Sequence, residues 1–123
     1  MRGQRLFVRQ IEASDHTAVR DFLALHCDHP SEIPARGLLG KLVGDLVAVM
    51  SISVTADSIR IVDITVAKEL RRKRIGRVMV SEALQLAKKI DRPRLEVDDG
   101  GSAVEFFRHV GFEQEGTQWV KRV

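Results

Sequence analysis

A run of basic residues that leads into a helix pattern is the part of this sequence best suited to chemistry. It reads R-R-K-R-I-G-R, covers residues 71–77, and follows a strand pattern that ends at Val66. A helix that begins near Arg74 presents free backbone N–H groups and the positive end of its dipole. Such a helix start binds anions, and a pyrophosphate is its natural occupant.

The side chains of this run support the same interpretation. Gly76 removes a side chain where a ligand would approach the backbone closely. Positive charge around the expected site comes from Arg71, Arg72, Lys73, Arg74 and Arg77. The sequence therefore predicts a phosphate-binding loop between a strand and a helix.

The residues before residue 38 predict a strand, a helix and a loop. Leu6–Ile11 has a strand pattern, and Ser14 or Asp15 can cap the following helix. Two prolines exclude a helix between Cys27 and Gly37, so we expect a loop there. The expected apolar stripe of the helix consists of Ala18, Val19, Phe22, Leu23 and Leu25.

The middle of the chain predicts three strands joined by tight turns. Leu38–Val43 and the segment from Leu46 onward flank Gly44-Asp45, which predicts a two-residue hairpin turn. A turn at Ala56-Asp57 leads into Ser58–Val66, a strand rich in β-branched residues. The second strand alternates, with Leu46, Ala48, Met50, Ile52 and Val54 on one face and Val47, Val49, Ser51, Ser53 and Thr55 on the other.

The rest of the chain predicts two helices and three strands. A helical pattern from about Arg74 to Ile90 precedes a short strand at Arg94–Val97. After the turn at residues 98–101, Ser102 and Glu105 form a capping box for a helix through Val110, which Gly111 ends. Residues 112–115 and 118–122 predict a closing hairpin around Gly116.

The resulting order is β-α-β-β-β-α-β-α-β-β. Hairpins give antiparallel neighbours, whereas the β-α-β unit across Ile90 requires a parallel pair. We expect an α+β fold with one mixed sheet of about six to seven strands and three helices. With 123 residues, the chain is expected to form a single domain over 1–123.

Residues 64–77 resemble the GNAT acetyltransferase motif V-x-x-x-x-[QR]-x-x-G-x-[GA], with Val66, Arg71 and Gly76 in place. Downstream, L-E-V at 95–97 and A-V-E-F-F-R-H-V-G-F at 103–112 resemble the second half of that family's pattern. The resemblance extends over nearly the whole chain. It implies the GNAT fold, acetyl-CoA as co-substrate, and transfer of the acetyl group to an amine acceptor.

The resemblance also implies individual roles. Backbone groups of Ile64, Thr65 and Val66 would pair with the pantetheine arm as an added strand does. Amides from Arg72 to Arg77, including those of Lys73, Arg74, Ile75 and Gly76, would bind the pyrophosphate. Phe107 would touch the cofactor, and Glu96 would act as the general base. Asp63 and Asp98 are further candidates for the base.

The chain also departs from the family pattern. Arg74 takes the place of the first motif glycine. Phe107 replaces a tyrosine that protonates the departing thiolate in many members, and phenylalanine cannot donate a proton. A loop follows the first helix where the family has a second helix that shapes the acceptor site. A catalytically weak protein that binds acetyl-CoA and regulates a partner protein is therefore the alternative to an N-acetyltransferase.

Composition excludes several other functions. One cysteine, Cys27, allows no intrachain disulfide, which is typical of a reducing compartment such as the cytoplasm. The longest apolar run, Leu46–Met50, is too short to span a membrane. A net charge of +3, with no aromatic platform beside R-R-K-R, argues against nucleic acid.

The cluster His26, Cys27, Asp28 and His29 lacks nearby further ligands for a metal, so we expect none. Cys27 lies outside both motifs, which favours direct attack by the amine without a covalent enzyme intermediate. The identity of the acceptor, small molecule or protein, and the choice between monomer and homodimer stay open.

Overall fold

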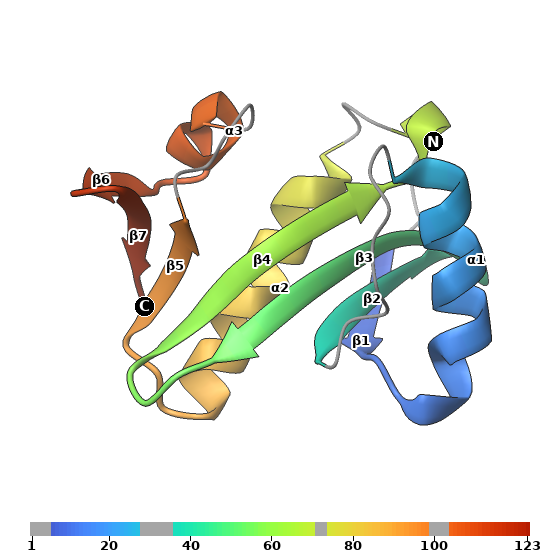
Figure 1. Ribbon diagram of the computed structural model, residues 1–123, viewed down its shortest axis with the longest axis horizontal. Helices are drawn as coiled ribbons and strands as arrows, with labels where there is room; N and C mark the ends of the chain where they lie inside the picture. Colours follow the sequence, from blue (N-terminus) through green and yellow to red (C-terminus); the bar gives the residue numbers. More distant parts are fainter. Residues whose placement is uncertain (1–5, 28–35, 71–73, 99–103) are drawn as a thin grey trace.

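The computed structural model describes residues 6–27, 36–70, 74–98 and 104–123. Strands and helices follow the predicted order (Figure 1). The helices are α1 (His16–His26), α2 (Ile75–Lys89) and α3 (Val104–His109), with 3-10 turns η1 (Ala13–Asp15) and η2 (Lys68–Leu70). The strands are β1 (Leu6–Gln10), β2 (Gly37–Leu42), β3 (Asp45–Val54), β4 (Ser58–Val66), β5 (Arg94–Asp98), β6 (Glu113–Glu115) and β7 (Gln118–Arg122).

The strands form one mixed sheet in the order β1-β2-β3-β4-β5-β7-β6. Every neighbouring pair is antiparallel except β4 and β5, which run parallel because α2 connects them. This arrangement confirms the α+β fold, the mixed sheet and the parallel pair that the sequence predicts.

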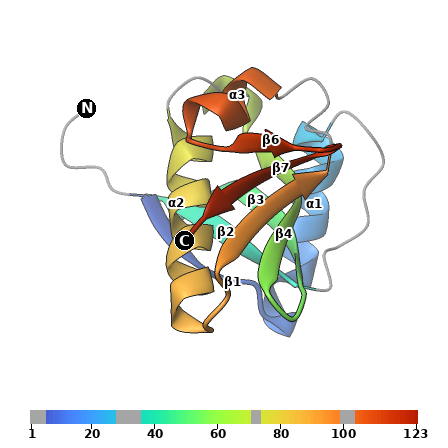
Figure 2. The ribbon, with the colours of Figure 1, turned by 90° about the vertical axis from the view of Figure 1, so that its left-hand side faces the viewer.

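Helices cover both faces of the sheet (Figure 2). α1 packs on β3 and β4, and α2 packs on β1 to β5 from the other side. Both sets of alternating β3 residues are therefore buried in the middle of the strand, at Val47, Ala48, Val49 and Met50. In the described ranges, no helix is both long and apolar enough to cross a bilayer.

The buried stripe of α1 differs from the expected one. Val19, Phe22 and Leu23 are buried as predicted, but Ala18 and Leu25 are exposed, Leu25 by 67%. The fourth buried position is His26. Residues 19, 22, 23 and 26 follow the i, i+3, i+4, i+7 spacing of one helix face, and residues 18 and 25 lie outside it.

The start of α1 also differs from the expected cap. Asp15 is the N-cap residue, but its side chain makes no capping hydrogen bond to the helix. Instead it accepts two hydrogen bonds from Arg9 of β1 and one from the Glu12 backbone N–H. Ser14 lies inside η1. The side chain of Asp15 therefore ties α1 to β1.

The first hairpin turn lies one residue earlier than predicted. Leu42 pairs with Asp45, so Val43 and Gly44 are the turn residues. Their φ values of 51° and 85° are those of a type I′ turn. The prediction of Gly44-Asp45 failed because valine disfavours positive φ, yet the register of the flanking strands places it there.

Termination of α3 agrees with the sequence. The helix ends at His109, and Gly111 has a φ of 98°, a value at which glycine avoids the strain of a side chain. The expected capping residue Ser102 lies outside the described residues.

Candidate cofactor and catalytic site

β4 and β5 diverge to form a fork in the sheet (Figure 1). Their parallel pairing runs from Ser58↔Arg94 to Ile61↔Val97 and stops there. β4 continues against β3 up to Val66. Within the described residues, the β5-facing edge of β4 from Val62 to Thr65 therefore has no strand paired with it. The expected cofactor residues Ile64 and Thr65 lie on this segment.

A β-bulge marks the point where the fork opens. Ser51 pairs with Asp63, whereas the next β3 residue, Ile52, pairs with Ile61. Val62 is the extra residue of the bulge, and its side chain is 61% exposed. A bulge bends its strand and interrupts the ladder. It thus provides a physical reason for β4 to part from β5 at Ile61.

The N-terminus of α2 follows the open end of β4 in sequence. Ile75 is buried and begins the helix, and Arg77 is exposed one turn further on. Arg74 precedes the helix in the left-handed region, with φ 65° and ψ 14°, and its side chain makes no capping hydrogen bond. The basic residues Arg71, Arg72 and Lys73 lie outside the described residues.

Gly76 makes room for a protein side chain. A Cβ atom added there would lie 3.2 Å from the ring of Phe106 in α3. The backbone of Gly76 has no positive φ. Close packing of α3 on the first turn of α2 therefore accounts for this glycine, whereas the sequence analysis had assigned it to the approach of a ligand.

Phe107 is part of the hydrophobic core. Its ring packs edge-on against Phe106 and Phe112, with centroid distances of 5.2 and 5.3 Å. It is buried, whereas Phe106 is half-buried and faces Gly76. The neighbour that sequence reasoning left out, Phe106, is thus the one that contacts the start of α2.

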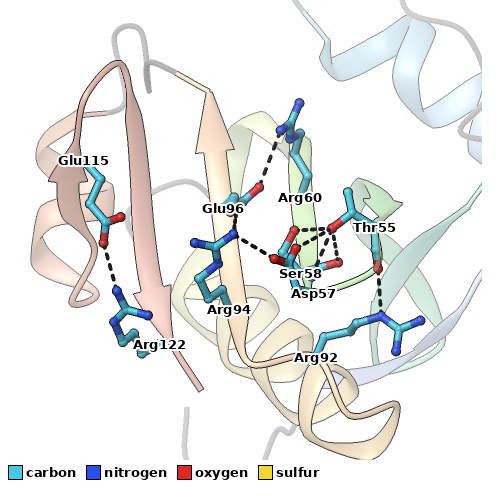
Figure 3. Close-up of polar contacts among 9 residues, drawn as sticks. All are labelled: Thr55, Asp57, Ser58, Arg60, Arg92, Arg94, Glu96, Glu115 and Arg122. Carbon is cyan, nitrogen blue, oxygen red and sulfur yellow. Dashed lines mark hydrogen bonds and ion pairs between the residues drawn. The ribbon is translucent and has the colours of Figure 1, made fainter.

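Glu96 is a buried carboxylate held between two arginines (Figure 3). Its Oε1 lies 3.5 Å from Nη2 of Arg60, and its Oε2 lies 3.0 Å from Nη2 of Arg94. The parallel register sets Arg60 directly beside Glu96. To act as a base, Glu96 would have to exchange one of these contacts for the acceptor amine.

Polar contacts hold the closed end of the fork together (Figure 3). Arg94 also pairs with Asp57, at 3.3 Å, and Thr55 and Ser58 share a hydroxyl hydrogen bond of 2.6 Å. Arg92 Nε donates to the Thr55 carbonyl at 2.8 Å, across the connection that leaves α2. These contacts join β4 and β5 at one end only.

The two other carboxylates lie nearer the opening. Asp63 is exposed on β4, directly after the bulge. Asp98 is the last residue of β5 and pairs with Gln118 of β7. Both candidates thus lie beyond the last β4–β5 pair, whereas Glu96 lies inside the paired region.

Sequence reasoning missed the role of His26. Its Nδ1 accepts a hydrogen bond of 3.0 Å from the backbone N–H of Lys68, at the start of η2. A polar residue on the buried stripe of α1 was the only signal. The histidine had been considered only for a metal cluster, whose members Asp28 and His29 lie outside the described residues.

A hollow of about 400 Å³ lies between α2, the end of α3 and β7. Arg77, His109 and Lys121 line it together with apolar side chains such as Val80 and Leu84. Lys121 Nζ also donates to the Val110 carbonyl at 2.7 Å. The hollow begins beside Arg77, in the first turns of α2, and has a cationic lining.

Known structures share this fold. A ribosomal-protein-S18-alanine N-acetyltransferase from Escherichia coli is 13% identical with a TM-score of 0.81, covering 97% of this chain and 94% of its own. Ard1 from Thermoplasma volcanium is 14% identical, with a TM-score of 0.76 and coverage of 96% and 97%. A GNAT family N-acetyltransferase from Escherichia coli in complex with CoA is 15% identical, with a TM-score of 0.78 and coverage of 98% and 82%.

Sequence comparison identifies the family directly. No curated protein matches the chain. The family model of the acetyltransferase (GNAT) domain matches residues 41–122, which include the fork, α2 and the closing hairpin. With two thirds of the sequence matched and the fold shared over nearly all of it, the chain belongs to the GNAT acetyltransferase family.

Proposed function

We propose that this protein transfers the acetyl group of acetyl-CoA to an amine. The observation that carries the proposal is the fork between β4 and β5, whose open β4 edge leads directly to the N-terminus of α2. An extended ligand arm can pair with a free strand edge, and a phosphate can bind a helix start. Acetyl-CoA joins these two features in one molecule.

In this proposal the pantetheine arm pairs with the backbone of Ile64, Thr65 and Val66. The pyrophosphate binds amides and basic side chains of residues 71–77. Phe107 supports this end of the site, since its ring packs against Phe106 beside Gly76. The cationic hollow next to Arg77 suits the phosphates of the nucleotide. The thioester then lies in the fork, beyond the last β4–β5 pair.

The reaction needs one proton acceptor and one proton donor. The amine nitrogen attacks the thioester carbonyl carbon, so that a C–N bond forms and the C–S bond breaks. The amine proton passes to Glu96, directly or through water, and CoA leaves as a thiolate. Because the sequence contains no tyrosine, water protonates the thiolate.

A direct binding measurement tests the cofactor site. Calorimetric titration with acetyl-CoA and with CoA is expected to show binding that the double variant Arg72→Ala, Lys73→Ala weakens by about tenfold or more. The matched control is Lys88→Ala, Lys89→Ala, which removes the same charge from the last turn of the same helix. Equal affinity of the two double variants would refute the assignment of the loop.

Substitution of two carboxylates tests the base. With an amine found by screening for CoA release, Glu96→Gln is expected to lower kcat by about 100-fold, since general bases contribute on that order. Asp63→Asn, at the exposed position after the bulge, is expected to leave kcat within about twofold. The opposite pattern would move the base from Glu96 to Asp63.

A second function is favoured by one specific observation. Both oxygens of Glu96 are engaged by arginines, and the sequence has no tyrosine to act as the acid. A protein that binds acetyl-CoA and reports its level to a partner needs neither group. Acetyl-CoA binding without turnover over a broad set of amines would support this regulator and exclude the enzyme.

A further inference from the structure

The turn that enters the phosphate loop is held from three directions. The Ala67 N–H donates to the Val47 carbonyl of β3 at 2.8 Å, and the Leu70 N–H donates to the Ala67 carbonyl at 2.9 Å. Between them, the Lys68 N–H donates to Nδ1 of His26 at 3.0 Å. The third contact is the one that a side chain provides, and it joins α1 to the turn.

His26 occupies a position where the helix face calls for an apolar residue. Its side chain belongs to the buried stripe with Val19, Phe22 and Leu23, and only 8% of the residue is exposed. Its ring packs against Phe22 with a centroid distance of 4.7 Å. A buried polar side chain is costly without a partner, and the Lys68 N–H is a partner that leucine could not serve.

The contact also constrains the imidazole chemically. Nδ1 can accept the Lys68 N–H only when the ring proton is on Nε2. The acceptor therefore has a defined position on the ring, close to the backbone of α1. Asparagine can present its oxygen at the place of Nδ1, whereas glutamine, one methylene longer, presents it at the place of Nε2.

We propose that His26 is a positioning residue of the acetyl-CoA site. It fixes Lys68, and through η2 it sets the path by which the chain enters residues 71–77 and the start of α2. The inference rests on the proposed function, because it assigns His26 to the affinity of the phosphate loop. His26 acts through the backbone of Lys68 and need not contact the cofactor itself.

Three variants separate positioning from packing. His26→Asn keeps an acceptor at Nδ1 and is expected to bind CoA within about twofold of wild type. His26→Gln leaves the Lys68 N–H without this acceptor and is expected to weaken CoA binding by about tenfold. Phe22→Leu disturbs the packing around the ring but keeps the hydrogen bond. We expect it to lower the urea midpoint while CoA affinity stays within about twofold.

Calorimetric titration with CoA, urea unfolding and amide hydrogen exchange at Lys68 provide the readouts. Exchange at Lys68 is expected to be slow in wild type and His26→Asn and fast in His26→Gln, which tests the contact without any ligand. Equal CoA affinity in the Asn and Gln variants, or an equal loss in Phe22→Leu, would overturn the inference. Wild-type protein that does not bind CoA would instead refute the proposed function itself, and the inference with it.

Discussion

Two residues show a conflict between side chain and backbone that the fold imposes. Val43 and Arg74 both have positive φ values, 51° and 65°, although neither is glycine. Left-handed conformations cost about 1 kcal/mol or more for residues with a Cβ atom. At both positions the register of the neighbouring elements overrides the local preference.

Val43→Asn is expected to stabilise the protein by about 1 kcal/mol, because asparagine tolerates the type I′ turn that valine resists. Val43 is 73% exposed, so its side chain contributes little burial. Urea unfolding measures the change. Val43→Thr is the control, since threonine is polar yet still β-branched. A gain of the same size in Val43→Thr would show that polarity, and not backbone strain, is the cause.

Arg74→Gly is also expected to raise the free energy of unfolding by about 1 kcal/mol, since glycine adopts φ 65° without strain. Arg74→Ala removes the same charge but keeps the Cβ atom and serves as the control. Thermal unfolding at equal ionic strength compares the two. If alanine stabilises as much as glycine, charge repulsion within the basic run, and not φ, explains the gain.

At the scale of elements, an ion pair couples β1 to α1. Arg9 donates from Nη1 and Nη2 to the two carboxylate oxygens of Asp15, each at 2.7 Å. These hydrogen bonds, together with the Glu12 backbone N–H, hold the pKa of Asp15 well below its usual range. The carboxylate form is thus favoured in the folded protein, so the pair contributes stability above the unfolded pKa of about 4.

Asp15→Asn is expected to lower the urea midpoint at pH 7, and this difference from wild type is expected to shrink as the pH falls below about 4. The sign follows from the lowered folded pKa, because acid must first protonate a carboxylate that folding keeps ionised. Urea titrations at pH 7 and at pH values below 4 measure it. Asp21→Asn, at an exposed position of α1, is the matched control. A difference that does not depend on pH would contradict the argument.

At the scale of the whole molecule, the fork joins the two halves of the sheet at one end only. β1 to β4 form one side and β5, β7 and β6 the other, with β4–β5 pairing limited to Ser58–Ile61 and Arg94–Val97. A ligand in the fork would bridge both sides. It would add contacts to a region that otherwise relies on the polar network around Glu96.

CoA is therefore expected to slow amide exchange most strongly at residues 62–65 of β4 and in the first turn of α2. At 100 times Kd, it is also expected to raise the free energy of unfolding by about 2.7 kcal/mol. Hydrogen exchange with mass spectrometry, with and without CoA, measures both effects. The β1–β2 hairpin, far from the fork in the strand order, is the internal reference. Protection spread evenly over both regions would argue against binding in the fork.

The sequence by itself determined the order and type of the elements, because burial imposes a period of two on strands and 3.6 on helices. It also determined the parallel pair, since a helix must connect β4 to β5. Val66, Arg71 and Gly76 were enough to indicate the family, which the match over residues 41–122 supports.

Only the tertiary structure decided which groups meet. Glu96 meets Arg60, 36 residues away, because of the parallel register, and His26 meets Lys68, 42 residues away, because α1 packs on β3 and β4. The bulge at Val62 and the contact of Phe106 with Gly76 likewise depend on neighbouring elements. Periodicity reports which side of an element is buried, but the partner on that side is set by how separate elements align in space.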